Sequence, residues 1–197
     1  MLMLRDREKG FEGLRIKLYY DENGDLTGGW GHNFTSKGIP PRIMNKYPNV
    51  DWVFKSLHLS VCEELLDADI EDAFFDLTKI FDLKSFGCKN QFCLYNEIDI
   101  DKALLPKQVV YVLVDMMFNM GKVRFMGFEK MIAAVDKKDW HEMAMEIVDS
   151  DYWRNGEKKK KRLEDCKIIG AYNRAQKNVD LVMELIDIKY TMHAKYM

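Results

Sequence analysis

The fold of this chain is decided by the stretch Glu12–His32, which reads EGLRIKLYYDENGDLTGGWGH. Polar and apolar residues alternate from Arg15 to Tyr20, and this period of two predicts a β-strand. The residues from Asp21 to Gly24 are typical of a turn, and a second extended run covers Asp25 to His32. The stretch therefore predicts a β-hairpin.

Three glycines fall in the second strand of this hairpin, at Gly28, Gly29 and Gly31. Glycine weakens a strand, because it has no side chain to pack and loses more backbone freedom on folding than other residues. We therefore expect another part of the chain, or a ligand, to approach the backbone closely here.

The segments on either side of the hairpin show other patterns. Residues 1–12 predict a short helix that ends at Gly13, because glycine accepts the left-handed conformation that follows a last helical turn. Residues 33–59 hold three of the four prolines and are expected to be irregular. From about Ser60 to Phe81, apolar residues recur at the spacing of a helix of about 20 residues, long enough to bridge two lobes.

The second half of the chain is mostly helical in pattern. The helical period is lost from Asp82 to Lys102 and returns after Pro106, a residue that the first turn of a helix accepts. The run Val109–Phe118 is apolar on nearly every side, so this helix is expected to form a core. A small hairpin followed by a helical lobe is an α+β layout, with further helices expected at 128–136, 138–149 and from 158 onward.

The composition excludes several classes of protein. Of 197 residues, 47% are apolar, and 30 basic against 32 acidic side chains leave a net charge of −2, so a dedicated nucleic-acid binder is not expected. The longest apolar run, Val109–Val114, is far shorter than the roughly 20 residues that span a bilayer, so no stable membrane insertion is expected. Charge at Arg5 and Asp6 precedes any apolar signal-peptide core, which predicts a protein made in the cytoplasm.

The cysteines do not indicate a metal site. Cys88 and Cys93 are the only close pair among the four, and no histidine lies near enough in sequence to complete a zinc pattern. We expect free thiols and no bound metal, and a disulfide between Cys88 and Cys93 stays open.

Two carboxyl groups and a hydroxyl fall around the hairpin. Glu12 closes the first helix, Asp21 opens the turn, and Thr27 lies on the returning strand. Glycosidic hydrolysis needs a pair of carboxyl groups flanking a cleft, because one protonates the leaving oxygen while the other activates water or attacks the sugar. Taken by itself, the pattern also fits solvated surface groups, since the chain has 32 acidic residues.

A detailed resemblance favours the catalytic interpretation. The motif E-G-x-R-x-x-x-Y-x-D from Glu12 to Asp21, followed by T-x-G-x-G-H from Thr27 to His32, resembles the active-site signature of the phage-type lysozymes, glycoside hydrolase family twenty-four, which includes the T-even phage endolysins. The resemblance covers roughly residues 5–172. It implies a lysozyme-like fold without a cofactor and continues through Asp69, Leu105 to Gly121, Gly127-Phe128, Asp139-Trp140 and Lys161-Arg162.

The resemblance implies a role for each residue of the signature. Glu12 is implied as the general acid, Asp21 as the base that activates water, and Thr27 as a hydroxyl that helps to hold that water, in an inverting reaction. His32 is implied to form a buried structural ion pair with Asp69. The alternative for His32 is a catalytic base, because histidines titrate near neutrality.

The resemblance also implies contacts to the sugar. Phe118 and Asn119 match positions that face the cleft, where an aromatic ring stacks on a sugar and an amide bonds its polar groups. A plain core aromatic is the alternative for Phe118. Asn33, Met131 and Glu146 match weaker sugar-contact positions.

The matched region predicts a lysozyme domain over residues 1–172. Residues 82–102 look inserted and are expected to lie on the surface, and residues 173–197 extend past the family core. The basic run Lys158–Arg162 is either a solvated helix face or a means of steering a polyanionic substrate. The parts expected within the domain are a β lobe at about 13–59, a linking helix at about 60–81 and a helical lobe at about 103–172.

The expected function is that of a muramidase, which hydrolyses the β-1,4 bond between N-acetylmuramic acid and N-acetylglucosamine in peptidoglycan. The expected setting is a phage or prophage endolysin, a monomer that collects in the host cytoplasm and reaches the periplasm and cell wall after a holin opens the membrane. Two alternatives stay open: a virion-carried lysozyme used at entry, and a non-catalytic wall-binding or structural protein that kept the fold.

Overall fold

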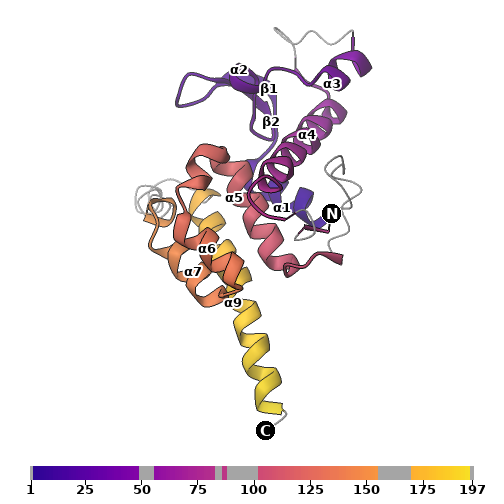
Figure 1. The fold of residues 1–197 in the computed structure, drawn as a ribbon. Coiled ribbons are helices and arrows are strands. Elements are labelled where there is room, and N and C mark those ends of the chain that lie inside the picture. The colour runs from indigo at the N-terminus through magenta and orange to yellow at the C-terminus, as the bar shows by residue number, and fades with distance from the viewer. Residues whose placement is uncertain (1, 49–55, 83–85, 88–101, 155–169, 196–197) are drawn as a thin grey trace. The chain divides into compact units, whose positions relative to one another are not determined.

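The computed structural model describes residues 2–48, 56–82, 86–87, 102–154 and 170–195 (Figure 1). Within these residues it contains a three-stranded antiparallel sheet together with helices, so the α+β prediction is confirmed. The chain divides into two compact units, Met1–Asp99 and Ile100–Met197, and the sheet lies in unit 1.

The sheet forms where the hairpin was predicted. Its strands β1 (Arg15–Tyr20), β2 (Leu26–Gly29) and β3 (His32–Asn33) lie in that order, and each is antiparallel to its neighbour. The predicted second strand is in fact two strands. The reason is that Gly29 and Gly31 have φ angles of +63° and +82°, which turn the chain between β2 and β3.

The two long helices of unit 1 are α1 (Leu2–Glu12) and α4 (Leu59–Leu77), and both lie where the sequence predicted them. α1 ends at Gly13, whose φ of +66° lets the chain leave the helix. α4 ends at Leu77, sooner than the predicted Phe81. It packs against α1 and β2, and its buried face forms the core of this unit (Figure 1).

Two short helices, α2 (Phe34–Lys37) and α3 (Pro41–Lys46), follow the sheet. The prediction of an irregular segment over 33–59 is therefore wrong for these residues. Pro41 lies in the first helical turn, where its missing N–H is not needed. The side chain of Asn33 caps α2, because its Oδ1 accepts a hydrogen bond of 2.9 Å from the backbone N–H of Ser36.

Phe86 corrects the expectation that residues 82–102 lie on the surface. Its side chain is fully buried and packs edge-on against the rings of Phe74 and Phe81, at centroid distances of 6.2 and 6.0 Å. At this position the segment completes the core beside α4. Cys88 and Cys93 of the same segment lie outside the described residues, as do Cys166 and the run Lys158–Arg162.

Unit 2 is helical in its described part. Its helices are α5 (Lys107–Met126), α6 (Glu129–Lys137), α7 (Trp140–Val148) and α9 (Gly170–Lys195). α5 is buried from Val109 to Met117, so the prediction of a core helix is confirmed. A kink interrupts it at Gly121, where φ is +72°. None of the described helices in either unit combines the length and apolar character that crossing a membrane requires.

A buried polar cluster joins α5 to α9. Asp115 is fully buried, and its Oδ1 lies 3.0 Å from Nε of Arg174, while its Oδ2 accepts a hydrogen bond of 2.5 Å from Nδ2 of Asn178. A buried carboxylate is stable only when it is paired, so these two residues offset the cost of burying Asp115. The segment expected as an extension from residue 173 thus contributes buried side chains to unit 2.

Candidate active site

Glu12 is the last residue of α1, and its side chain lies against Gly31 in the turn between β2 and β3. A Cβ atom built on Gly31 would lie 2.9 Å from Oε2 of Glu12, and the φ of Gly31 is +82°. Glycine is therefore needed at position 31 for two reasons, its backbone conformation and the space that the Glu12 carboxyl group occupies.

The neighbouring glycines confirm the expected close approach to this part of the backbone. A Cβ atom on Gly28 would lie 2.5 Å from Cδ2 of Leu18, and one on Gly29 would lie 3.5 Å from Cβ of Cys62 on α4. The glycines let β2 lie close to β1 on one side and to α4 on the other. The sheet that carries the candidate site is thus held tightly to the main helix of unit 1.

Asp21 is oriented by backbone groups of the hairpin turn. Its Oδ1 accepts hydrogen bonds from the backbone N–H groups of Asn23 and Asp25, at 2.8 and 3.0 Å. The backbone N–H of Asp21 in turn donates to the carbonyl oxygen of Asp25 at 2.9 Å. Because two donors engage Oδ1, the orientation of the carboxylate is fixed. Within the described residues no backbone N–H group donates to Oδ2.

Thr27 is joined to Asp21 through the backbone of Asp25. The Thr27 side chain is 5% exposed, and its Oγ1 donates a hydrogen bond of 3.2 Å to the carbonyl oxygen of Asp25, the same oxygen that Asp21 engages. In the sheet Thr27 pairs with Tyr19 of β1 and with Asn33 of β3. Thr27 therefore lies in the sheet, Asp21 lies in the turn between β1 and β2, and Glu12 packs on the turn between β2 and β3.

His32 and Asp69 form the buried pair that the resemblance implied. Nδ1 of His32 lies 2.9 Å from Oδ2 of Asp69, and Nε2 lies 2.8 Å from the carbonyl oxygen of Gly38. Lys37 of α2 adds a third member, because its Nζ donates to Oδ1 of Asp69 at 2.6 Å. Burial would raise the pKa of Asp69, but the hydrogen bond and charge of His32, followed by those of Lys37, lower that pKa below its usual value.

The remaining sugar-contact candidate of unit 1, Asn33, makes bonds within the chain through both ends of its amide. In addition to capping α2, it donates from Nδ2 to Oδ2 of Asp25 at 2.8 Å. Asn33 thus ties β3 to the hairpin turn that holds Asp21.

The other sugar-contact candidates lie in unit 2. Phe118 is half-buried and Asn119 is exposed, both on α5 just before its kink. Met131 of α6 is fully buried, and Glu146 of α7 is half-buried, with an oxygen 3.8 Å from Nζ of Lys130. Of the four, Asn119 has the most accessible side chain and Met131 the least.

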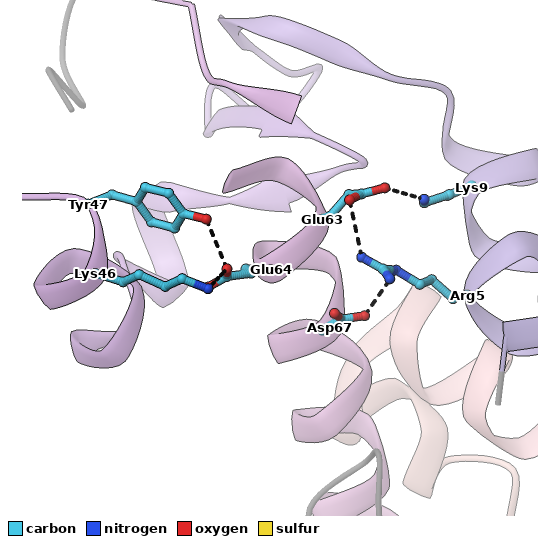
Figure 2. Close-up of polar contacts among 7 residues, drawn as sticks. All are labelled: Arg5, Lys9, Lys46, Tyr47, Glu63, Glu64 and Asp67. Carbon is cyan, nitrogen blue, oxygen red and sulfur yellow. Dashed lines mark hydrogen bonds and ion pairs between the residues drawn. The ribbon is translucent and has the colours of Figure 1, made fainter. Parts of the chain in front are cut away.

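A set of ion pairs between α1 and α4 was not predicted from the sequence (Figure 2). Nζ of Lys9 lies 2.8 Å from Oε1 of Glu63, and Arg5 reaches both Glu63 at 3.7 Å and Asp67 at 3.2 Å. Nζ of Lys9 also lies 4.6 Å from the ring centroid of Trp30. A signal was present, because the two basic residues are four apart on one helix and the two acidic residues are four apart on the other.

The pKa values of the two acidic partners shift in opposite directions. The hydrogen bond from Lys9, helped by the charges of Lys9 and Arg5, lowers the pKa of Glu63. Burial raises the pKa of Asp67 despite the nearby Arg5. Lys9 and Glu63 therefore form the tighter ionic contact between the two helices.

No cluster of three or more metal-ligating side chains occurs in the described part of the chain. The candidate catalytic residues of unit 1 remain Glu12, Asp21 and Thr27, an acid, a base and a hydroxyl that can bind water.

This chain is similar to known proteins both in sequence and in structure. No family model matches the chain. A curated protein of Dictyostelium discoideum, "Probable T4-type lysozyme 2", is 23% identical over 150 residues, which cover 76% of this chain and 84% of that protein. Among solved structures, the muramidase domain of SpmX from Asticaccaulis excentricus matches with a TM-score of 0.57 at 14% identity, covering 92% of this chain and 95% of that one.

The structural match is too distant in sequence to show more than the fold, and it spans nearly the whole of both chains. The curated relative carries the resemblance at the level of sequence. The chain therefore has a lysozyme-like α+β fold, and its resemblance to the phage-type lysozymes is confirmed.

Proposed function

We propose that this protein is a muramidase-type peptidoglycan hydrolase, which cleaves the β-1,4 bond between N-acetylmuramic acid and N-acetylglucosamine. One observation carries the proposal. The carboxyl group of Glu12 packs on Gly31 at one turn of the sheet, and the backbone of Asp25 beside the other turn makes hydrogen bonds with the side chains of both Asp21 and Thr27. The relatives named as a lysozyme and a muramidase domain support it.

The proposed reaction divides the work between the two carboxyl groups. Glu12 donates a proton to the leaving glycosidic oxygen, and Asp21 accepts a proton from the attacking water. Oδ1 of Asp21 is already engaged by two backbone donors, so Oδ2 is the oxygen proposed to act as the base. Thr27 helps to hold the water, which attacks from the opposite face and inverts the anomeric configuration.

Further residues are proposed as substrate contacts. Phe118 and Asn119 of α5 are proposed to stack on a sugar ring and to bond its polar groups, and Asn33 and Glu146 are proposed as weaker contacts. The fully buried side chain of Met131 does not support the sugar contact expected for it. The half-buried ring of Phe118 and the exposed amide of Asn119 support the first pair best, since both offer accessible surface.

The proposed biological role is that of a phage or prophage endolysin. In this role a monomeric enzyme collects in the host cytoplasm and reaches the periplasm and cell wall with the help of a holin. A virion-carried lysozyme would use the same chemistry at entry. A non-catalytic wall-binding protein is the less favoured alternative, because binding alone does not need an oriented Asp21 beside Thr27.

The test is hydrolysis of purified, soluble peptidoglycan fragments by wild type and by Glu12→Gln and Asp21→Asn. Removal of a general acid or base costs about 10² to 10⁴ in rate, so both variants should be nearly inactive yet melt like wild type. Glu22→Gln is the matched control, because Glu22 is an exposed acid next to Asp21. A wild-type protein that releases no new reducing ends, or an active Glu12→Gln, overturns the proposal, and NMR of the first product reports the anomer.

A further inference from the structure

We propose that Lys9 is a positioning residue for Glu12, acting through Trp30 and Glu63. The inference rests on the proposed function, since Glu12 is taken as the general acid. In this proposal Lys9 holds the last turn of α1 against the sheet and thereby orients the carboxyl group of Glu12.

The first step is the placement of Lys9 itself. Lys9 lies three residues before Glu12 on α1, so the two side chains leave the same face of the helix. Its ammonium group makes two contacts at once, with Oε1 of Glu63 on α4 at 2.8 Å and with the ring of Trp30, whose centroid lies at 4.6 Å. A cation held between a carboxylate and an aromatic face has little freedom to move.

The second step links these contacts to Glu12. Trp30 is buried and immediately precedes Gly31, the residue on which the Glu12 carboxyl group packs. The last turn of α1 is therefore fastened to consecutive residues of a single turn, with Lys9 on Trp30 and Glu12 on Gly31. α1 stops directly afterwards at Gly13, whose φ is +66°, so the peptide that follows Glu12 does not hold it in a helix.

The third step separates Lys9 from the other basic residues that pair with α4. Arg5 pairs with Glu63 and Asp67 (Figure 2). On α1 it lies seven residues before Glu12, whereas Lys9 lies three residues before it. Lys46 of α3 offers a closer comparison. It pairs with Glu64 of α4, and its Nζ lies 5.6 Å from the ring centroid of Tyr47.

Lys46 thus makes the same two kinds of contact as Lys9, an ion pair to α4 and a cation–π contact. Its aromatic partner Tyr47 follows α3, is not next to Gly31 and donates a hydrogen bond to Glu64. The Lys46 side chain is also more exposed than that of Lys9, 61% against 25%. Lys46→Met is therefore a matched control for Lys9→Met.

The main experiment compares kcat and KM of wild type, Lys9→Met, Lys9→Arg and Lys46→Met on soluble peptidoglycan fragments. A displacement of about 1 Å in a catalytic group costs up to about 10²-fold in rate. We expect Lys9→Met to lower kcat about tenfold with KM unchanged, because the acid is misplaced while the substrate still binds. Lys9→Arg should restore most of kcat, and Lys46→Met should stay within about twofold of wild type.

A second measurement does not depend on activity. Glutamate labelled with carbon-13 at the side-chain carboxyl gives an NMR signal for Glu12, which is assigned by its loss in Glu12→Gln. Lys9→Met should move or broaden this signal, and Lys46→Met should leave it unchanged. If Lys9→Met does not fold, Glu63→Gln removes the anchor of Lys9 and should have the same effect on the Glu12 signal.

The two proposals fail in different ways. If wild type hydrolyses peptidoglycan but Lys9→Met and Lys46→Met have equal kcat and leave the Glu12 signal unmoved, the positioning role of Lys9 is wrong. If wild type has no hydrolytic activity, the proposed function is wrong, and the NMR comparison still decides whether Lys9 fixes the Glu12 side chain.

Discussion

Oδ2 of Asp69 lies 2.9 Å from Nδ1 of His32, and the two side chains are 3% and 2% exposed. Asp69 belongs to α4 and His32 to β3, so this pair connects the main helix of unit 1 with the last strand of the sheet. Both ring nitrogens of His32 are engaged, one by Asp69 and the other by the carbonyl oxygen of Gly38, which favours a structural role over a catalytic one. The consequences for stability and for pH can be measured separately.

His32→Ala should lower the free energy of unfolding by about 3 kcal/mol, because it leaves a buried carboxylate with only part of its compensation. The turnover of the molecules that remain folded should be close to wild type. Lys37→Met is the control, since the Lys37 side chain is 40% exposed and its loss should cost less than about 1 kcal/mol. Urea unfolding and kcat check this, and a stable but inactive His32→Ala would instead assign His32 to the chemistry.

The stability conferred by Asp69 should depend on pH in a defined direction. The pKa of Asp69 in the folded state is lowered from 3.8, so the charged carboxylate stabilises the folded protein at pH values above about 3.8. The difference in melting temperature between wild type and Asp69→Asn should shrink as the pH falls below about 3.8. Thermal melts at pH 7, 5 and 3 measure it, and a gap that widens in acid would contradict the assigned direction.

Gly31→Ala should reduce activity more than stability. The added Cβ would lie 2.9 Å from Oε2 of Glu12, so the carboxyl group must move, and a small displacement of that kind is expected to lower kcat at least about tenfold. Gly24→Ala is the matched control, because Gly24 has the same φ of +82° but nothing within 4 Å of an added Cβ. Both variants should lose about 1–2 kcal/mol of stability to backbone strain, and equal loss of kcat in the two would sink the prediction.

Phe86→Ala should destabilise unit 1 by about 3–5 kcal/mol, because it opens a cavity between Phe74 and Phe81. Phe75→Ala serves as the control, since Phe75 is 55% exposed and its removal leaves no cavity. Chemical unfolding of the two variants distinguishes a core residue from a surface insertion. Equal stability of the two would restore the original expectation of a surface segment.

The parts of the fold that the sequence predicted are those set by local pattern. The alternation from Arg15 to Tyr20 and the helical spacing after Ser60 describe β1 and α4 because each pattern reports a single buried face. The glycines of the second strand also predicted that other groups approach the backbone closely, and Cys62 lies near Gly29 and Glu12 near Gly31. In each case a local pattern of residue types indicates the structure without reference to distant segments of the chain.

The parts that were missed depend on contacts between distant segments. The three prolines of residues 33–59 predict only an interruption of regular structure, although Pro41 is well suited to begin α3. Nothing within residues 82–102 distinguishes Phe86 from an exposed aromatic, because its burial depends on Phe74 and Phe81. The pairing of Lys9 with Glu63 likewise depends on which helices pack together. The spacing of charges along each helix does not identify the partner helix.

The cluster of Asp115, Arg174 and Asn178 bears on the order in which the protein is finished during translation. Asp115 and Asn178 are 63 positions apart, so the carboxylate leaves the ribosome long before either of its partners on α9 exists. Until then Asp115 must remain in water, because burying it unpaired is costly. The contacts that orient Asp21 and Thr27, by contrast, are complete once residue 33 has emerged. Synthesis from the N-terminus would therefore assemble the candidate catalytic hairpin first and withhold the packing of α5 until the last helix arrives.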